Sequence, residues 1–426
     1  MLIEFSIANF RSFDKRQYFS MASSKKNKVS QADNVFSTGL TATPFALRSV
    51  CILGPNASGK SNFVKALAFM RSFVSNSARK GQVEDKILIQ PFRLRKRNKK
   101  RPSEFEIVFI HKDNLYQYGF SLDEKRVWEE WLFKKSLKIK GKLHSVFERK
   151  YIPDSKKYFW KINRNLKGNK EVWKASTREN ALFLSTAVQL KSESLRDPFD
   201  WFNEFMRPVP SPDRLAVDCT IDMLNNPKEK GAVIDFIKSV DIQISDFNIE
   251  EVSLNEATKG MPKGIATELR KQMQKEKFQA VNIKAKHNTV EGGAEYFDLE
   301  EDESDGTNVL FGISGPILDT LKNGYTVIFD ELSNSLHPFA LRYLVNLFHN
   351  KKLNKKGAQL IFTSHDVSVI HPDIMQRDQI WFIEKNQSMG SELFPLSDFK
   401  PRKNEIYSRG YLGGRYGALP KIKGFI

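Results

Sequence analysis

Cysteine is nearly missing from this sequence, and its scarcity removes several classes of protein from consideration. The 426 residues contain two cysteines, Cys51 and Cys219, which lie far apart and form no CxxC pair. This spacing excludes a disulfide framework and a zinc cluster, and it favours a reducing compartment. The seven histidines are scattered along the chain and give no metal-ligand spacing either.

Long hydrophobic runs are missing as well. No apolar run approaches the ~20 residues that a helix needs to span a bilayer. In the first residues, MLIEFSIANFRSF, apolar and polar side chains alternate, and the sequence then becomes polar, unlike a secretory leader. We therefore expect a soluble, cytoplasmic protein with no membrane partner. The 40% of hydrophobic residues and the 33 phenylalanines are enough for a substantial core, which excludes wholesale disorder.

Negative charge is in deficit. The chain has 68 Lys and Arg residues against 50 Asp and Glu residues, which gives a net charge of +18. A field of this sign attracts polyanions such as nucleic acid, nucleotides or an acidic partner. Solubility is the other interpretation, and the net charge alone does not separate the two. Nucleic acid therefore remains a candidate partner.

The order of apolar patterns predicts an α/β core that is split in sequence. A short apolar strand over Leu47–Leu53 leads into a Gly-rich loop, and an amphipathic helix over Asn62–Val74 follows. A β-rich stretch from about 87 to 160 and helical patterns from about 176 to 278 come next. We expect the N-terminal half of the core over 1–125, an inserted β-rich and helical lobe over 126–300, and the C-terminal half over 301–426.

The same patterning predicts further elements. A hairpin turn is expected at His111–Asn114, and the polar stretch Ser23–Asp33 is interpreted as a loop. Helices are expected over Gly264–Phe278, Val309–Leu321 and Phe339–His349, and strands over Tyr325–Phe329, Gln359–Thr363 and Gln379–Ile383. No internal repeat is found.

One loop carries a complete phosphate-binding motif. Gly54-Pro55-Asn56-Ala57-Ser58-Gly59-Lys60-Ser61 fits G-x-x-x-x-G-K-[ST], and with Asn62 it forms the expected ATP-binding set. Glycines let backbone N–H groups turn inward around phosphates, and the following helix presents its positive end to them. Lys60 should reach the β- and γ-phosphates of ATP, and the Ser61 hydroxyl should ligate Mg²⁺. A chance match in a Gly/Ser-rich turn is the alternative, which the flanking strand and helix disfavour.

A second motif ends an apolar strand with two acids, Asp330 and Glu331. Strand ends of this kind meet the ligand in open α/β sheets. Asp330 would hold the Mg²⁺ shell, and Glu331 would polarise the attacking water. Adjacent residues of a strand face opposite ways, so the pair must lie where the strand breaks into a loop. Considered alone, the pair could equally be a strand-end cap. Lys60 and Asp330 are 270 residues apart, so a large insertion must separate the two halves.

With these motifs in place, the chain resembles a known group. Glu303–Thr307, ESDGT, precedes a helix ahead of Asp330, as the signature does in ABC-type ATPase heads of the SMC, RecF and OLD group. The resemblance gives Ser304 and Gly306 the roles of the signature's serine and glycine, which cap the γ-phosphate bound on the opposite subunit. It implies an α/β P-loop head, with a β-rich arm and a helical lobe, that works as a homodimer or higher oligomer. The full LSGGQ pattern is lacking, so nucleotide binding has more support than dimer-dependent hydrolysis.

Three more segments carry the same resemblance. Asn334–His337 follows the acids as a D-loop does, and His365, in FTSHD, ends a strand as the switch histidine does. Arg11, in NFRSF, matches an N-terminal arginine that contacts nucleotide in these heads. His365 thus joins Lys60 and Glu331 as an expected catalytic residue. A core histidine that caps a strand is the alternative for His365.

The likeness is closest to AbiLi-like, RloA-like and AriA-like ATPases of bacterial abortive-infection and anti-phage systems. The shared segments are NFRSF, GPNASGKSN, ESxGT, DE followed by SLHP, and FTSHD, within about the first 125 and the last 125 residues. The likeness implies an ATPase that controls a toxic effector. OLD-type relatives carry a TOPRIM nuclease after the ATPase, but only 61 residues follow His365, so we expect such a nuclease to be a separate chain. A DNA-repair or chromosome-maintenance ATPase that acts directly on DNA is the second hypothesis, and the positive charge favours it.

The densest basic run, Arg93–Arg101, has two interpretations. It lies between β-rich segments, so a solvated hairpin tip is the simpler one. A finger that contacts the phosphates of a duplex is the other. No aromatic residue interleaves with the run, as single-strand binders require. Nearby Gln90 is the best Q-loop candidate, but a surface residue is the simpler interpretation of it.

Overall fold

The computed structural model divides the chain into two compact units. The first contains Met1–Pro212, Asp319–Asn334 and Leu341–Ile426, and the second contains Asp213–Leu318 and Ser335–Ala340. The structure describes residues 1–23, 33–82, 84–139, 141–209, 217–240, 242–253, 258, 261–262, 264–268, 270, 280–402 and 405–420. These units differ from the three predicted segments, because residues 126–209 belong to the first unit and the signature segment belongs to the second.

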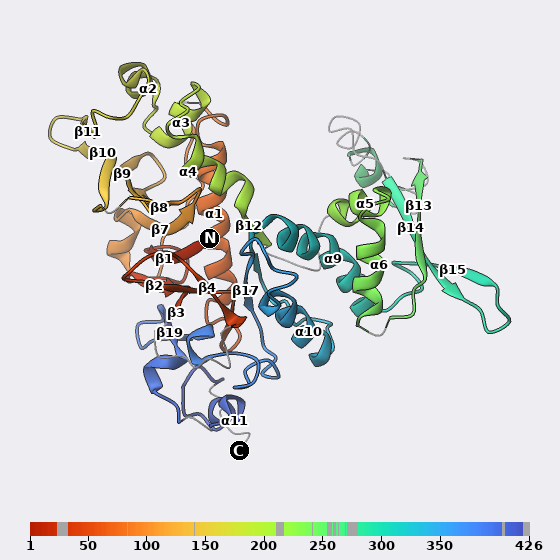
Figure 1. Cartoon of the computed structure of the whole chain (residues 1–426). Coiled ribbons are helices and arrows are strands. Elements are labelled where there is room, and N and C mark those ends of the chain that lie inside the picture. Colours follow the sequence, from red (N-terminus) through yellow and green to blue (C-terminus); the bar gives the residue numbers. More distant parts are fainter. Residues whose placement is uncertain are drawn as a thin grey trace. The chain divides into compact units, whose positions relative to one another are not determined.

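Within the described residues, the core of the first unit is a six-stranded sheet (Figure 1). Its spatial order is β12 (Met206–Val209), β16 (Thr326–Phe329), β17 (Gln359–Thr363), β6 (Ser49–Leu53), β18 (Ile380–Lys385) and β19 (Ser391–Pro395). β19 pairs antiparallel with β18, and the other neighbours pair in parallel. Every residue of β6, β16 and β17 is buried, as expected of a parallel sheet covered on both faces. Strands from both ends of the chain thus lie side by side, which confirms the predicted split core.

An antiparallel sheet, seven-stranded over the described ranges, forms a second layer of this unit (Figure 1). Its order is β11 (Lys157–Ile162), β10 (His144–Ile152), β9 (Val127–Ser136), β8 (Asn114–Leu122), β7 (Ser103–His111), β1 (Leu2–Ala8) and β2 (Gln17–Ser20). Lys112 and Asp113, with φ of 46° and 58°, form the predicted turn between β7 and β8. β1 pairs directly with β7, so the β-rich segment shares one sheet with the N-terminal strand. This pairing is the reason that residues beyond 125 belong to the first unit.

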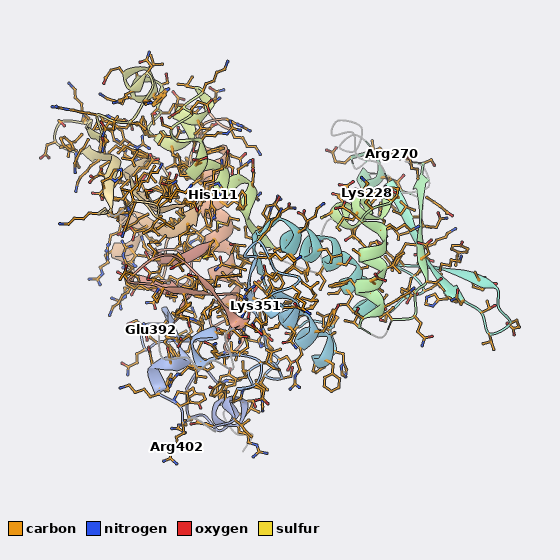
Figure 2. The ribbon with its side chains drawn as sticks, viewed as in Figure 1. His111, Lys228, Arg270, Lys351, Glu392 and Arg402 are labelled. Atoms are coloured by element: carbon orange, nitrogen blue, oxygen red, sulfur yellow. The ribbon has the colours of Figure 1, made fainter. Side chains whose placement is uncertain are left out.

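Helix α1 (Lys60–Asn76) packs against both sheets. Its buried side chains recur at helical spacing and include Phe63, Leu67, Met70 and Val74. The Phe63 ring makes edge-to-face contacts with Phe5 of β1 and Phe19 of β2, at centroid distances of 5.8 and 5.1 Å. Ile52 of β6 and Ile328 of β16 belong to the same core. Figure 2 shows side chains filling the space between these elements. This packing fixes the position of the loop that precedes α1.

Smaller elements complete the first unit. A small sheet has the order β3 (Ala22–Ser23), β5 (Phe45–Leu47) and β4 (Val35–Ser37). The helices are α2 (Lys170–Ser176), α3 (Phe183–Gln189), α4 (Arg196–Asp200), α11 (Tyr407–Leu412) and most of α10 (Pro338–His349). Single helical turns are η2 (Lys96–Lys100), η3 (Trp201–Phe205), η5 (Arg377–Gln379) and η6 (Leu396–Phe399). Except at its two ends, the predicted loop Ser23–Asp33 lies outside the described residues. None of the described helices is long and apolar enough to cross a membrane.

The second unit combines helices with an antiparallel sheet. The sheet has the order β13 (Asp246–Val252), β14 (Ala280–Asn288) and β15 (Ala294–Asp298), and the helices are α5 (Asp218–Asn225), α6 (Lys230–Lys238) and α9 (Asp305–Asn323) as far as Leu318. The Thr220 hydroxyl of α5 donates to the Phe311 carbonyl of α9 at 3.0 Å. The helical pattern expected up to 278 is wrong at β12 and β13, because both take their hydrogen bonds from distant strands. Of the predicted helix Gly264–Phe278, residues 264–268 and 270 are helical, and the others lie outside the described residues.

Candidate functional site

The phosphate loop, Gly54–Ser61, connects β6 in the middle of the parallel sheet with α1. A side chain at Gly54 would overlap the carbonyl oxygen of Ile383. Gly59 has a φ of 122°, which favours glycine, and a side chain there would overlap the Ser391 hydroxyl. The loop backbone is therefore packed too closely for other residues at these positions. A strand, a glycine-rich loop and a helix in this order within a parallel sheet form a P-loop head, so the predicted fold class is confirmed.

Lys60, the first residue of α1, is buried over the loop. Its ammonium donates to the carbonyls of Gly54 at 2.8 Å and Pro55 at 3.2 Å. Burial lowers the pKa of Lys60, while the charges of Glu331 and then Asp330 act to raise it. The structure therefore brings both predicted acids close to the predicted phosphate-binding lysine.

Asp330 and Glu331 follow the last residue of β16, where the strand ends. Glu331 adopts a φ of 53°, a left-handed conformation that is uncommon for a residue with a side chain. The Thr363 hydroxyl donates to Asp330 Oδ1 at 2.8 Å and accepts the Glu331 N–H at 2.7 Å. The Asn334 amide donates to Glu331 Oε2 at 2.7 Å. The pair thus lies where the strand breaks into a loop, as expected, and two neighbouring polar groups fix the acids in place.

His365 follows β17 at the same edge of the sheet. Its Nε2 atom lies 3.6 Å from Glu331 Oε1. Burial and then the charge of Lys60 lower the pKa of His365, while Glu331 and Asp330 act to raise it. The imidazole is therefore mainly neutral at pH 7, and it can exchange a hydrogen bond beside the Glu331 carboxylate.

Arg11 lies in a tight turn that contacts the phosphate loop. The neighbouring Ser12 hydroxyl accepts from the Asn62 amide at 2.9 Å. Arg11 has a φ of 49°, and its N–H donates to the Gln90 carbonyl at 2.7 Å. Its Nε atom is buried and has no hydrogen-bond partner within the described part of the chain. Burial and then the charge of Arg93 lower the pKa of Arg11. The arrangement leaves a guanidinium ready to receive an anion near the loop.

Ser304 and Gly306 belong to the second unit, whereas Arg11, the phosphate loop, the two acids and His365 belong to the first. The Ser304 hydroxyl accepts the Thr307 N–H at 3.2 Å, which caps the start of α9. A side chain at Gly306 would lie 2.8 Å from the Ser335 carbonyl oxygen. Both residues therefore have a local structural reason in addition to the role expected from the resemblance.

Thr363, which bonds to both acids, was not among the residues predicted from the sequence. Its position was readable, because it ends a strand parallel to β16 and lies within FTSHD. What the pattern could not show is the register that places this hydroxyl beside Asp330. Asn334 was considered only as part of a D-loop, although its bond to Glu331 is local and spans three residues.

A protein-family model described as "AAA domain, putative AbiEii toxin, Type IV TA system" matches residues 49–371, about three quarters of the chain. Two of the similar solved structures are the SmcHead bound to the C-winged helix domain of ScpA, with 13% identity and a TM-score of 0.44, and the SMC head domain from Thermotoga maritima, with 12% identity and a TM-score of 0.39. Both alignments cover 92% of this chain, together with 97% and 98% of the other chain. A search of curated proteins finds no match.

Proposed function

We propose that this chain binds ATP with Mg²⁺ at the phosphate loop and hydrolyses it. The premise is that the chain belongs to the AAA-domain family that it matches over residues 49–371. The observation that carries the proposal is the buried Lys60 ammonium, which bonds to the loop carbonyls and is acted on by the charges of Asp330 and Glu331. Catalysis of phosphoryl transfer rests on positioning and on stabilising charge, and these are the groups that do so in P-loop proteins.

The residues around the loop fit both ATP and Mg²⁺. The close packing at Gly54 and Gly59 suits a backbone cradle for phosphates. Ser58 presents a buried hydroxyl that has no hydrogen-bond partner among the described residues. Ser61 and Asp330 provide hard oxygen ligands, which Mg²⁺ prefers. The described residues contain no group of three His, Cys, Asp or Glu side chains that could hold a metal, so phosphate oxygens and water would complete the coordination. Bound Mg²⁺ would stabilise negative charge on the phosphoryl oxygens.

Glu331 is assigned as the residue that orients and polarises the attacking water. Asn334 holds one carboxylate oxygen, which leaves the other oriented toward His365. The neutral imidazole of His365 would hydrogen-bond the same water or the γ-phosphate. Arg11 would add a positive charge beside the phosphate loop, from the tight turn that contacts it. In this scheme Lys60, Glu331 and His365 are the catalytic residues.

Two copies are proposed to face each other, with Ser304 and Gly306 of one copy over the nucleotide of the other. The free N–H groups at the start of α9 favour an anion, and Ser304 caps that end of the helix. Substitution of Ser304 by alanine should then weaken ATP-dependent dimerisation without changing the affinity of the monomer for ATP. Size-exclusion chromatography with light scattering, with and without ATP, measures the first quantity, and equilibrium dialysis measures the second.

The direct test of the proposed activity is phosphate release by the purified chain with Mg²⁺ and ATP. Lys60→Ala should weaken ATP binding roughly 10–100-fold, because the ammonium that pairs with the phosphates is gone and such charged hydrogen bonds contribute ~1.5–3 kcal/mol. Lys65→Ala is the matched control, since Lys65 is exposed on the same helix. Equal ATP affinity in Lys60→Ala and wild type would contradict the assignment of this loop.

As its biological role, we propose control of a separate toxic effector in an anti-phage defence system, with a nuclease as the expected effector. The family description, which names a toxin and a type IV toxin–antitoxin system, supports this direction. The tagged chain would be expressed with its neighbouring genes, and stoichiometric partners would be identified by mass. A partner that is toxic when ATP turnover releases it supports the proposal, and recovery of the chain alone contradicts it.

Direct action on DNA in repair or chromosome maintenance is the second candidate, and the net charge of +18 favours it. This candidate predicts that DNA stimulates phosphate release. The first candidate predicts that turnover responds to the partner protein. Measurement of turnover with each addition separates the two.

A further inference from the structure

The basic run Arg93–Arg101 lines a cleft in the first unit. The cleft has a volume of about 770 Å³. Its walls contain six exposed cationic side chains from three separate segments, namely Arg93, Lys99, Lys100, Arg101, Lys125 and Lys156. In the part of the chain that the structure describes, none of the six forms a salt bridge. Two acids, Asp123 and Glu124, also line the cleft, and Glu124 pairs with Lys86 at 3.6 Å, so positive charge is in excess in this hollow.

The run is held in a fixed shape by buried asparagines. The side-chain amide of Asn9 donates to the carbonyls of Asn98 at 2.9 Å and Arg101 at 2.8 Å. The buried Asn98 amide donates to Asp14 at 2.6 Å, and Arg95 forms an ion pair with the same carboxylate at 2.9 Å. A solvated hairpin tip does not require such bonds. The structure instead holds like charges close together, which is unfavourable unless an anion compensates them.

The lining of the cleft also includes aromatic residues from β9 and β10. The indole N–H of Trp128 donates to Asp123 Oδ2 at 2.8 Å, and the ring of Trp128 lies edge-on to Tyr151 at 5.5 Å. These contacts fix a half-buried indole at the cleft. The same Asp123 carboxylate accepts the N–H groups of Lys125 and Arg126, so its oxygens are directed at its own turn. Aromatic residues, absent from the basic run itself, thus come from a distant segment.

We propose that this cleft binds single-stranded nucleic acid, with phosphates against the six cations and a base against Trp128. A groove of positive charge combined with an aromatic platform is the arrangement that single strands use. The volume lies in the range of pockets that enclose a small ligand, ~300–1,000 Å³, which admits a few nucleotides and excludes a duplex. The inference does not depend on the proposed ATPase activity, because none of these residues belongs to the phosphate loop or the acid pair.

The test uses the full chain, without nucleotide, and a fluorescein-labelled 12-residue oligo-dT, whose anisotropy is measured over a salt series. The variant replaces Lys99, Lys100 and Arg101 with alanine. Each lost phosphate contact should weaken binding about fivefold at 0.1 M salt, so the variant should bind roughly 100-fold more weakly. The slope of log K against log salt should become shallower by about 2. Thermal unfolding of the variant should match the wild type, since these side chains are exposed.

The control removes the same charge elsewhere, by replacing Lys352, Lys355 and Lys356 with alanine. These residues are exposed in the loop after α10, where Figure 2 labels Lys351. The control should bind oligo-dT within about twofold of the wild type. Equal losses in the two triple variants would mean that only net charge matters, and this outcome overturns the cleft proposal. Absence of oligo-dT binding by the wild type overturns it as well.

A second pair of variants tests the aromatic platform. Trp128→Phe retains a ring and should keep binding within a few-fold, whereas Trp128→Leu should bind about tenfold more weakly. A 12-base-pair duplex should bind more weakly than the single strand. Duplex binding as tight as that of oligo-dT would refute the single-strand assignment. Phosphate release by the triple cleft variant, measured in parallel, should equal that of the wild type, so failure of this proposal and failure of the ATPase proposal give different results.

Discussion

Replacing Glu331 with glutamine removes one negative charge from the nucleotide edge of the sheet and leaves its shape almost unchanged. The new amide retains an oxygen that can accept from Asn334, as Oε2 does at 2.7 Å. Both side chains meet the same left-handed backbone, so the strain at φ of 53° does not change. The variant should therefore fold and bind ATP like the wild type.

Loss of a general base typically slows a reaction by ~10²–10⁴. This range corresponds to about 2.7–5.4 kcal/mol in the barrier, at 1.36 kcal/mol per factor of ten. The protonation of His365 does not account for such a loss at pH 7.5. Burial and Lys60 already lower the pKa of His365, and removal of the Glu331 charge, which acts to raise it, lowers it further. The imidazole is neutral in both proteins at this pH.

The assay is phosphate release at saturating Mg²⁺ and ATP, with ATP affinity measured separately. Glu171→Gln is the matched control. It makes the same chemical change at an exposed glutamate, which pairs with Lys174. Turnover of Glu331→Gln within twofold of the wild type, with normal ATP affinity, would refute the assignment of Glu331. Loss of ATP binding would instead assign Glu331 a binding role.

Three further predictions follow from the site and its support. Thr363→Val should lower the free energy of unfolding by about 1–3 kcal/mol and reduce turnover, because the Glu331 N–H loses its acceptor. Thr363→Ser keeps the hydroxyl and should match the wild type in urea unfolding and phosphate release. Gly59→Ala should abolish ATP binding in a dialysis measurement, since the new methyl group overlaps Ser391 at a φ of 122°; retained affinity would contradict the packing argument. Burial lowers the pKa of His349 to about 3, so below pH 6.5 the unfolded chain takes up a proton that the native state does not. This histidine should therefore remove about 1.0 kcal/mol of stability between pH 6.5 and 5.5, and unfolding of His349→Gln at the two pH values should show a smaller loss than the wild type.

The parts of the site that consist of consecutive residues could be predicted from the sequence. The phosphate loop and the acid pair are local motifs, and the strands and helices that carry them have strong periodicity. Their proximity could be inferred because parallel strands end at the same edge of a sheet. His365 was predicted from the resemblance to ABC-type heads, and it lies beside Glu331.

The rest depends on pairings across the sequence that no local pattern records. Glu130 shows this, because it forms a fully buried ion pair with Arg149 and accepts the N–H groups of Phe183 and Leu184 at the start of α3. In sequence, Glu130 is one of several acids in a strand. The buried Asn98 within the basic run is a second case, since its partners Asn9 and Asp14 lie more than 80 residues away. The unit boundaries differ from the predicted segments for the same reason, because strand register decides them.

The central place of β6 in the parallel sheet also bears on how the chain is made. Its neighbours are β17 and β18, and 310 residues separate Leu53 from Thr363. At a synthesis rate of ~5–20 residues per second, this strand, which is wholly buried in the folded protein, waits roughly 15–60 s on the ribosome for its first sheet partner. Such long-range pairing gives the fold a high contact order and slow, late closure. The antiparallel layer and α1 are complete by residue 162, and they can cover one side of β6 in the meantime. The nucleotide edge, with its acids and histidine, forms only after synthesis has passed residue 365.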